Sequence, residues 1–249
     1  MKKIGLLGCG KIGQNILEDL YKTDSVKVTF IQDPFYKKET DCPVITKADE
    51  TILAQTDLVI ESAMSDVLKE NADVILKHCD MMVFSVTAFA DAQFYYHIQS
   101  LLEKYHHKIY LPHGAILGID GIADGKRIID SVCIETIKNP KSLGRTDTER
   151  TVLYEGSSRE ACKLYPRNVN VHATVALAGI GFDKTKSIII SDPAVDTNTH
   201  IIHIKGEGIS FTLNISSFAN GGVTGKYTPY SAIGSVHRVL GDGEDFLFV

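Results

Sequence analysis

Three glycines near the amino terminus have the spacing of a nucleotide-binding turn. Gly8, Gly10 and Gly13 form a G-x-G-x-x-G pattern between an apolar segment and a helix-forming one. In such a turn the first glycine closes a tight bend, the second lets the backbone approach a pyrophosphate, and the third lets the helix pack closely on the strand. The pyrophosphate would bind the free N–H groups at the positive end of that helix. The pattern therefore predicts a phosphate site that also includes Lys11 and Ile12.

An acidic residue follows this turn by twenty positions. Asp33 stands at the end of a second apolar segment, residues 26–31, where a carboxylate can accept hydrogen bonds from the ribose hydroxyls of NAD. The glycine pattern alone could be no more than a tight strand-to-helix turn, but the acid in register favours nucleotide binding. The same carboxylate would repel a 2′-phosphate, and Pro34 stands where an arginine could have bound one. We therefore expect NAD as the cofactor, with NADP the less favoured alternative.

Histidine is the side chain best suited to move a proton near neutral pH, and the chain has nine. Residues 199–205 alternate as a half-buried strand. His200 shares its face with Ile202 and Ile204 and is expected to point inward. His203 lies on the opposite face and is expected to meet solvent. His200 is therefore the candidate base, the alternative being a buried structural histidine that hydrogen-bonds backbone.

The elements that would position these residues follow from the hydrophobic rhythm. Further strands are expected at 57–62, 81–86 and 108–111, with Asp66 and Asp91 opening the helices between them. Strands that alternate with helices predict a doubly wound parallel sheet of Rossmann type, with right-handed crossovers. Ligands of such sheets bind beyond the carboxyl ends of the strands. Those ends add five cofactor-contacting candidates: Ser62, Ala63, Ser85, Val86 and Thr87.

Beyond residue 112 the pattern changes to that of an α+β domain with a largely antiparallel sheet. One helix is expected around 169–178, and strands are expected at 131–137, 186–190, 199–205 and 209–216. The last of these alternates cleanly, so one face should be buried and the other wet. We expect residues 1–111 to form the NAD-binding domain and 112–217 a domain for substrate binding and oligomerisation. A helix within 218–249 is expected to pack back on the first domain.

Composition narrows the class of protein further. The 249 residues carry a net charge of −5 without long runs of one sign, which disfavours nucleic acid and anionic membranes as partners. No apolar stretch reaches the roughly 18–20 residues of a membrane span, and the chain begins on a strand rather than a signal peptide. The five scattered cysteines include no C-x-x-C and suit a reducing cytoplasm. No group of histidines or cysteines has metal-ligand spacing, so no metal site is expected.

Five blocks of residues form a pattern more specific than any single motif. Residues 84–91 are similar to the segment S-V-G-A-L-x-D, and residues 113–120 to the loop S-G-A-I-G-G-L-D. Residues 165–171 match F-P-x-N-x-N-V, and 177–185 match L-A-G-x-G-x-D-x-T. Residues 192–200 match D-P-x-x-x-x-N-x-H. In this order, and over nearly the whole chain, the blocks resemble the L-aspartate dehydrogenases.

The resemblance implies an enzyme that oxidises L-aspartate to iminoaspartate with NAD or NADP. The imine could be hydrolysed to oxaloacetate or feed NAD biosynthesis. By the matched positions, Ala115 and Asn170 would contact NAD and His200 would be the active-site residue. This fits the chemistry, because the substrate ammonium must lose a proton before Cα can release a hydride. The resemblance also implies a homodimer joined by the second domain, and the uncharged polar face of residues 209–216 suits such a contact.

A dicarboxylate substrate needs cationic or N–H donors. Lys184, Lys226 and His113 are the candidates, although each could be a solvated surface group. The chain departs from the family at two single positions, where His113 replaces a serine and Thr87 replaces a glycine. It also departs in residues 220–228, where the family usually has N-P-K-T-S before a helix and this chain has its lysine displaced by three places. Two alternatives stay open. One is a dehydrogenase or reductase for another small amino or keto dicarboxylate, and the other is a catalytically weak NAD-binding regulatory protein.

Overall fold

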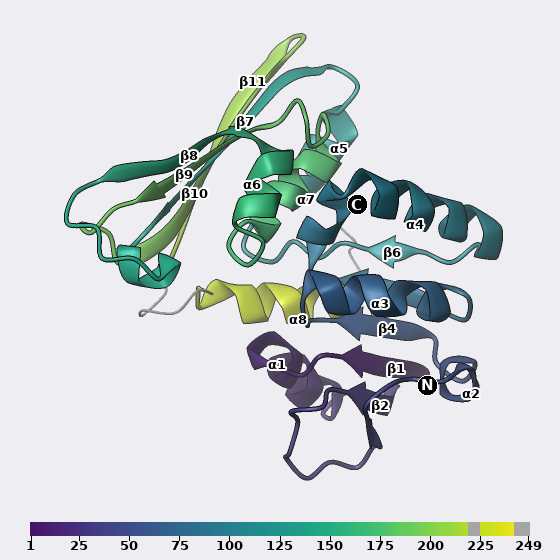
Figure 1. The fold of residues 1–249 in the computed structure, drawn as a ribbon. Coiled ribbons are helices and arrows are strands. Elements are labelled where there is room, and N and C mark those ends of the chain that lie inside the picture. The colour runs from purple at the N-terminus through teal and green to yellow at the C-terminus, as the bar shows by residue number, and fades with distance from the viewer. Residues whose placement is uncertain (219–224, 242–249) are drawn as a thin grey trace. The chain divides into compact units, whose positions relative to one another are not determined.

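Two separate sheets organise the chain, one in each of two units (Figure 1). The computed structural model describes residues 1–218 and 225–241. The first unit is discontinuous: it comprises Met1–Pro112 and a C-terminal segment that begins at Ser231. The second unit comprises His113–Tyr230. Among the described residues, no helix is long and apolar enough to cross a membrane.

The first unit contains a six-stranded sheet in which all neighbouring strands are parallel. Its order is β3-β2-β1-β4-β5-β6, and the strands are β1 (Lys2–Leu7), β2 (Val26–Gln32), β3 (Val44–Ile45), β4 (Leu58–Glu61), β5 (Asp80–Val83) and β6 (Ile109–Tyr110). Every residue of β4 is buried, as expected for a strand covered on both faces. This is the doubly wound sheet that the sequence predicts. The edge strand β3 was not predicted, because two residues show no periodicity.

The helices of the first unit are α1 (Lys11–Leu20), α2 (Glu50–Leu53), α3 (Ser65–Leu76), the short 3₁₀ helix η1 (Val86–Ala90), α4 (Ala92–Tyr105) and most of α8 (Tyr227–Leu240). Asp91 caps α4 as predicted, because its side chain accepts hydrogen bonds from the N–H groups of Gln93 and Phe94. The prediction that Asp66 caps α3 is wrong. Met64 holds the N-cap position and Asp66 lies in the first turn, where it still meets the positive end of the helix.

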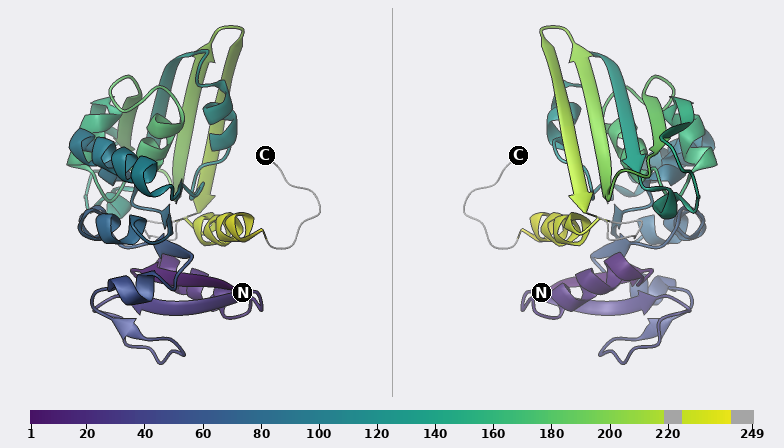
Figure 2. Two further views of the ribbon diagram at one scale, coloured as in Figure 1. Left: turned by 90° about the vertical axis from the view of Figure 1, so that its right-hand side faces the viewer. Right: turned by 90° about the vertical axis from the view of Figure 1, so that its left-hand side faces the viewer.

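The second unit contains a five-stranded sheet in the order β11-β10-β7-β9-β8, with only β7 and β9 parallel. Its strands are β7 (Ile129–Lys138), β8 (Thr151–Ser157), β9 (Lys186–Ser191), β10 (Thr197–Gly206) and β11 (Ile209–Phe218), and its helices are α5 (Ile119–Gly125), the 3₁₀ helix η2 (Pro140–Leu143), α6 (Ser158–Leu164) and α7 (Asn170–Ala178). Figure 2 shows β7, β10 and β11 as long strands lying side by side. The largely antiparallel sheet and α7 agree with the sequence. The sequence did not predict β8, whose residues are half-buried without a clean alternation.

Each unit has its own apolar core. The core of the second unit joins Ile134 of β7, Ile202 of β10 and Val175 of α7. In the first unit, Ala232 and Val236 of α8 belong to the core that surrounds β1 and β2. The C-terminal helix therefore packs on the sheet of the first unit. Of the expected C-terminal segment, residues 219–224 and 242–249 lie outside the described residues.

Candidate functional site

The glycine turn between β1 and α1 has a geometry that excludes larger residues at two positions. Gly8 adopts a positive φ of 84°, and a Cβ atom there would lie 2.6 Å from the Cβ of Ala63. A Cβ at Gly13 would lie 2.7 Å from the Ser62 hydroxyl, so only glycine lets α1 pack this closely on the strand ends. By contrast, no atom lies within 4 Å of a Cβ placed on Gly10. Such open space beside the backbone is what the approach of a pyrophosphate requires.

The N-terminus of α1 is suited to an anion. Gly10 is the N-cap residue, and no side chain caps the helix or places an acid in its first turn. The first intrahelical hydrogen bond runs from Gln14 N to Gly10 O at 2.9 Å. The N–H groups of Lys11, Ile12 and Gly13 therefore precede the helical ladder at the positive end of the helix. These residues fit the diphosphate of a dinucleotide.

Asp33 is tied to the glycine turn through its carboxylate. Oδ2 accepts a hydrogen bond from Cys9 N at 2.8 Å, and Oδ1 accepts one from Phe35 N at 2.8 Å. These bonds fix the acid just past the end of β2, where the ribose hydroxyls of a bound NAD are expected. Burial, followed by the nearby Asp33 charge, raises the pKa of Cys9 to about 12, so this cysteine stays a thiol. All five cysteines are free.

Glu61 organises the strand ends beside this turn, and sequence reasoning missed it. It is fully buried and accepts hydrogen bonds from the N–H groups of Ala63, Phe84 and Ser85 and from the Ser85 hydroxyl. Burial raises the pKa of Glu61, and these hydrogen bonds act in the opposite direction. The carboxylate thereby holds together the ends of β4 and β5, which carry the predicted cofactor-contacting residues. The signal in the sequence was an acid at the end of an otherwise apolar strand.

The other residues at the end of β5 are buried. Ser85, Val86 and Thr87 are each no more than 6% exposed. The Thr87 hydroxyl lies 2.8 Å from the hydroxyl of Ser65, in the first turn of α3. Threonine in place of the family's glycine is therefore accommodated by a hydrogen bond.

In the second unit, the alternation predicted for β10 is confirmed. His200 is 3% exposed and shares the buried face of the strand with Ile202 and Ile204. The side chain of His203 is 45% exposed on the other face. His200 pairs across the sheet with Thr136 of β7, which is also buried.

A continuous chain of buried polar groups leads from His200 into the unit. The hydroxyl of Thr136 lies 2.8 Å from His200 Nδ1 and 2.6 Å from His172 Nε2. His172 Nδ1 lies 2.8 Å from the Ser187 hydroxyl, which lies 2.7 Å from that of Ser158. His172 comes from α7, and its two hydrogen-bond partners come from β7 and β9. The chain locks the orientation of both imidazole rings.

This arrangement sets the protonation state of His200, which is neutral but a weaker base than a free imidazole. Burial, and after it the charge of Lys138, lowers the pKa of His200 to about 3, so the ring is neutral at ordinary pH. The pKa of His172 is also lowered, chiefly by burial. A hydroxyl donates one hydrogen bond, so when Thr136 donates to His172 it must accept from His200 Nδ1. His200 then carries its proton on Nδ1 and presents a bare lone pair on Nε2.

The remaining predicted residues of the second unit lie in loops or at element ends. Ala115 and His113 are half-buried in the segment before α5, and Asn170 is the first residue of α7, two positions before His172. Two of the candidates, Lys184 and Lys226, are exposed.

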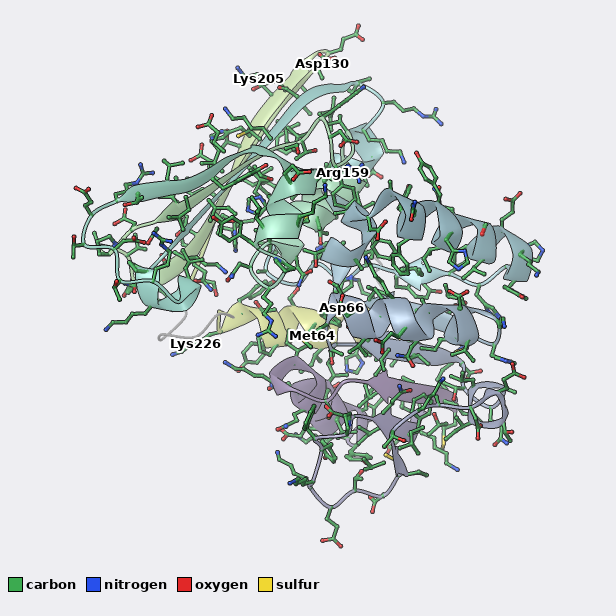
Figure 3. The ribbon with its side chains drawn as sticks, viewed as in Figure 1. Met64, Asp66, Asp130, Arg159, Lys205 and Lys226 are labelled. Carbon is green, nitrogen blue, oxygen red and sulfur yellow. The ribbon has the colours of Figure 1, made fainter. Side chains whose placement is uncertain are left out.

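The two exposed lysines lie at different levels of the sheet. Lys226 N donates to the carbonyl oxygen of Phe218, which pairs with Thr197 at the start of β10, so Lys226 lies at the sheet end near His200. Lys184 precedes β9 and lies five residues before Ile189, the partner of Thr136. The structure therefore does not bring Lys184 to His200. Figure 3 shows Lys226 and Lys205 at opposite ends of this sheet. The altered residues 220–224 lie outside the described part of the chain.

A Rossmann sheet with an open glycine turn and an acid after β2, combined with an α+β unit that buries a neutral histidine, defines an NAD-dependent oxidoreductase. Comparison with protein families supports this class. Residues 8–112 match the NAD-binding domain of homoserine dehydrogenase, and residues 120–239 match the C-terminal domain of aspartate dehydrogenase. The chain belongs to the L-aspartate dehydrogenase family.

Individual relatives match this chain over most or all of its length. It is 32% identical to the L-aspartate dehydrogenase of Nitrosopumilus maritimus, over 97% of this chain and 98% of that protein. It is 36% identical to the L-aspartate dehydrogenase of Methanococcoides burtonii, over 87% and 88% of the two chains. The crystal structure of aspartate dehydrogenase from Thermotoga maritima matches with a TM-score of 0.84 at 30% identity, covering 100% of both chains. The resemblance inferred from the sequence blocks is confirmed.

Proposed function

We propose that this protein oxidises L-aspartate to iminoaspartate, with NAD as the electron acceptor. The observation that carries the proposal is the setting of His200, whose ring is buried, neutral and fixed through Nδ1 by Thr136. His200 also occupies the histidine position of the matched D-P-x-x-x-x-N-x-H block. Family membership supports aspartate as the substrate, because the relatives named above are L-aspartate dehydrogenases.

The residues of the chain divide the work between the two units. The turn at Gly8–Gly13 and the carboxylate of Asp33 would hold the diphosphate and ribose of NAD. When bound, NAD accepts the hydride that leaves the substrate Cα. His200 Nε2 would take the proton that the substrate ammonium must first lose, while Thr136 holds the ring in the tautomer that exposes this lone pair. Asn170 and Ala115, at the family's cofactor-contacting positions, are proposed to contact NAD.

Cofactor choice belongs to the same proposal. Asp33 is fixed in place by two backbone donors, so it cannot readily swing away from a 2′-phosphate. A fixed negative charge there disfavours NADP by repulsion and by loss of the ribose hydrogen bonds. We therefore propose NAD as the preferred cofactor and NADP as the poorer one.

A homodimer formed through the second unit is proposed as well. β11 is an edge strand of the described sheet, and its ten residues Ile209–Phe218 include no charged side chain. An uncharged edge of this length is a template for pairing with another chain, and a two-fold axis would satisfy both edges at once. On the same face the neighbouring strand β10 contributes His203 and Lys205, so the charge-free surface is confined to β11.

The proposed activity is tested by mixing the purified full chain with NAD and single amino or hydroxy acids, and following NADH absorbance at alkaline pH. We expect L-aspartate to be oxidised with a higher kcat/KM than L-glutamate, L-alanine or L-malate. Faster turnover of a different dicarboxylate would favour another substrate of the same site. Binding of NADH without turnover of any of these compounds would favour a regulatory NAD-binding protein.

A further inference from the structure

Lys138 is the last residue of β7, and its side chain is buried within the second unit. It is 3% exposed and lies two positions beyond Thr136, so the two side chains share one face of the sheet. Thr136 pairs with His200, and Lys138 pairs with Ser191 of β9, which is also buried. No sequence motif singled out this lysine. It nevertheless lies at the sheet end that carries the proposed base.

The charge of Lys138 has no counterpart in the described structure. Within residues 1–218 and 225–241 its ammonium group forms no ion pair and no side-chain hydrogen bond. Burial lowers the pKa of Lys138 to about 8, and no carboxylate acts against this effect. A largely buried lysine without an ion-pair partner is costly, so lysines are seldom kept this way without a function.

The groups that face Lys138 are the two neutral imidazoles. Its positive charge lowers the pKa of His200 on β10, after the larger effect of burial, and that of His172 on α7, after burial and the neighbouring His200. Asp147 and Asp192 also lie near this sheet end, but their ion pairs are with Arg145 and Arg150. Around Lys138 the sheet end therefore combines a cation and a proton acceptor, and no carboxylate of the described chain is paired with the cation. An amino dicarboxylate offers the complementary set, since its carboxylates are anionic and its ammonium must give up a proton.

We propose that Lys138 binds a carboxylate of the substrate beside His200. This assignment rests on the proposed function and deepens it, because it places the recognition of the dicarboxylate on a buried strand residue instead of the exposed Lys184. A carboxylate supplies the missing charge-assisted hydrogen bonds of the ammonium group. It also offsets the positive charge that weakens His200 as a base, so the substrate would strengthen the group that deprotonates it.

The direct test is calorimetric titration of the full chain with succinate, a dicarboxylate that has no amine to titrate. We expect Lys138→Met to raise the succinate Kd by at least about thirtyfold, as is typical when one partner of a buried charge pair is removed. Lys205→Met, which changes an exposed lysine of the same sheet, is the matched control and should leave the Kd unchanged. Lys138→Met should also keep NADH affinity and match or exceed the unmodified Tm, because it removes an uncompensated buried charge. A lysine with a merely structural role would instead lower the Tm and leave the Kd unchanged.

A second measurement needs no variant and stands even if Lys138→Met fails to fold. In the unmodified protein, succinate affinity should be constant between about pH 6 and 7 and should fall about tenfold per unit well above pH 8, because Lys138 loses its proton there. His200 and His172 do not titrate in this range, since both pKa values are lowered from that of free histidine.

Undetectable succinate binding, an unchanged Kd in Lys138→Met, or a flat pH dependence would overturn the assignment of Lys138. Lys138-dependent succinate binding in a protein that does not oxidise L-aspartate would uphold the carboxylate site and overturn the proposed function. If Lys138→Met oxidised L-aspartate with an unchanged KM, the proposed function would stand and the assignment of Lys138 would be overturned.

Discussion

At the level of single residues, the chemistry open to an imidazole depends on which face of β10 carries it. His200 meets Thr136 in the interior, whereas His203 lies in solvent with Thr212 and Glu135 as its partners. The three-residue separation puts the two rings on opposite faces of the strand. The bond from Thr136 fixes the orientation of the buried ring, whereas the ring of His203 is held only at the surface. This difference supports His200 as the proton acceptor.

The cofactor preference also depends on one residue. We expect the unmodified protein to have a higher kcat/KM with NAD than with NADP, because the fixed carboxylate of Asp33 repels a 2′-phosphate. Asp33→Ala should narrow this gap by lowering activity with NAD and raising it with NADP. Initial rates over a concentration series of each cofactor measure the effect. An equal or better kcat/KM with NADP in the unmodified protein would show that Asp33 does not have this role.

At the level of elements, the second sheet determines where the polar chain can form. β7, β9 and β10 lie next to one another, and α7 packs on them, so Thr136, Ser187, His200 and His172 are drawn into one buried line. The line is polar but uncharged, because burial keeps both rings neutral. Such a line is stable only while each buried donor has an acceptor and each buried acceptor has a donor.

This burial predicts a loss of stability in acid. Both rings have folded-state pKa values below the unfolded value of about 6.5, so their contribution is fully present above that pH and is lost as the pH falls below it. For His200, with a pKa of about 3, the loss should approach about 1.4 kcal/mol per pH unit between pH 6 and 4. Urea unfolding at several pH values measures it. His172→Gln should be less stable at pH 7 yet lose less stability in acid. Parallel curves for the two proteins would contradict the assigned neutral state of His172.

Sequence patterns predicted the elements that repeat regularly and missed those that depend on distant partners. The Rossmann sheet follows from regular alternation of strands and helices, and the inward position of His200 from a period of two. Glu61, Lys138 and His172 gave no such signal, because their roles come from groups up to 64 positions apart along the chain that only the fold brings together, as in the Thr136–His200 bond. The N-cap of α3 was predicted at Asp66, but it lies two residues earlier, at Met64. A cap position depends on where the backbone enters the helix, which the sequence pattern does not specify.

At the level of the whole molecule, the uncharged edge strand β11 predicts self-association. Light scattering at micromolar concentration should give twice the chain mass of 27.3 kDa or a higher multiple. Thr212→Lys, which places a charge on the exposed face of β11, should shift the protein toward the monomer while leaving NADH affinity unchanged, because the nucleotide turn lies in the other unit. A monomeric mass for the unmodified protein would refute the proposed dimer.

The most direct measurement is the rate of NADH formation from L-aspartate by the unmodified protein and by His200→Ala, each at saturating NAD. The loss of the proton acceptor should lower kcat by about 10²–10⁴-fold while NADH affinity stays nearly the same. His203→Ala, on the exposed face of the same strand, should retain close to full activity. Equal losses in the two variants, or an unimpaired His200→Ala, would contradict the assignment of His200 as the base in aspartate oxidation.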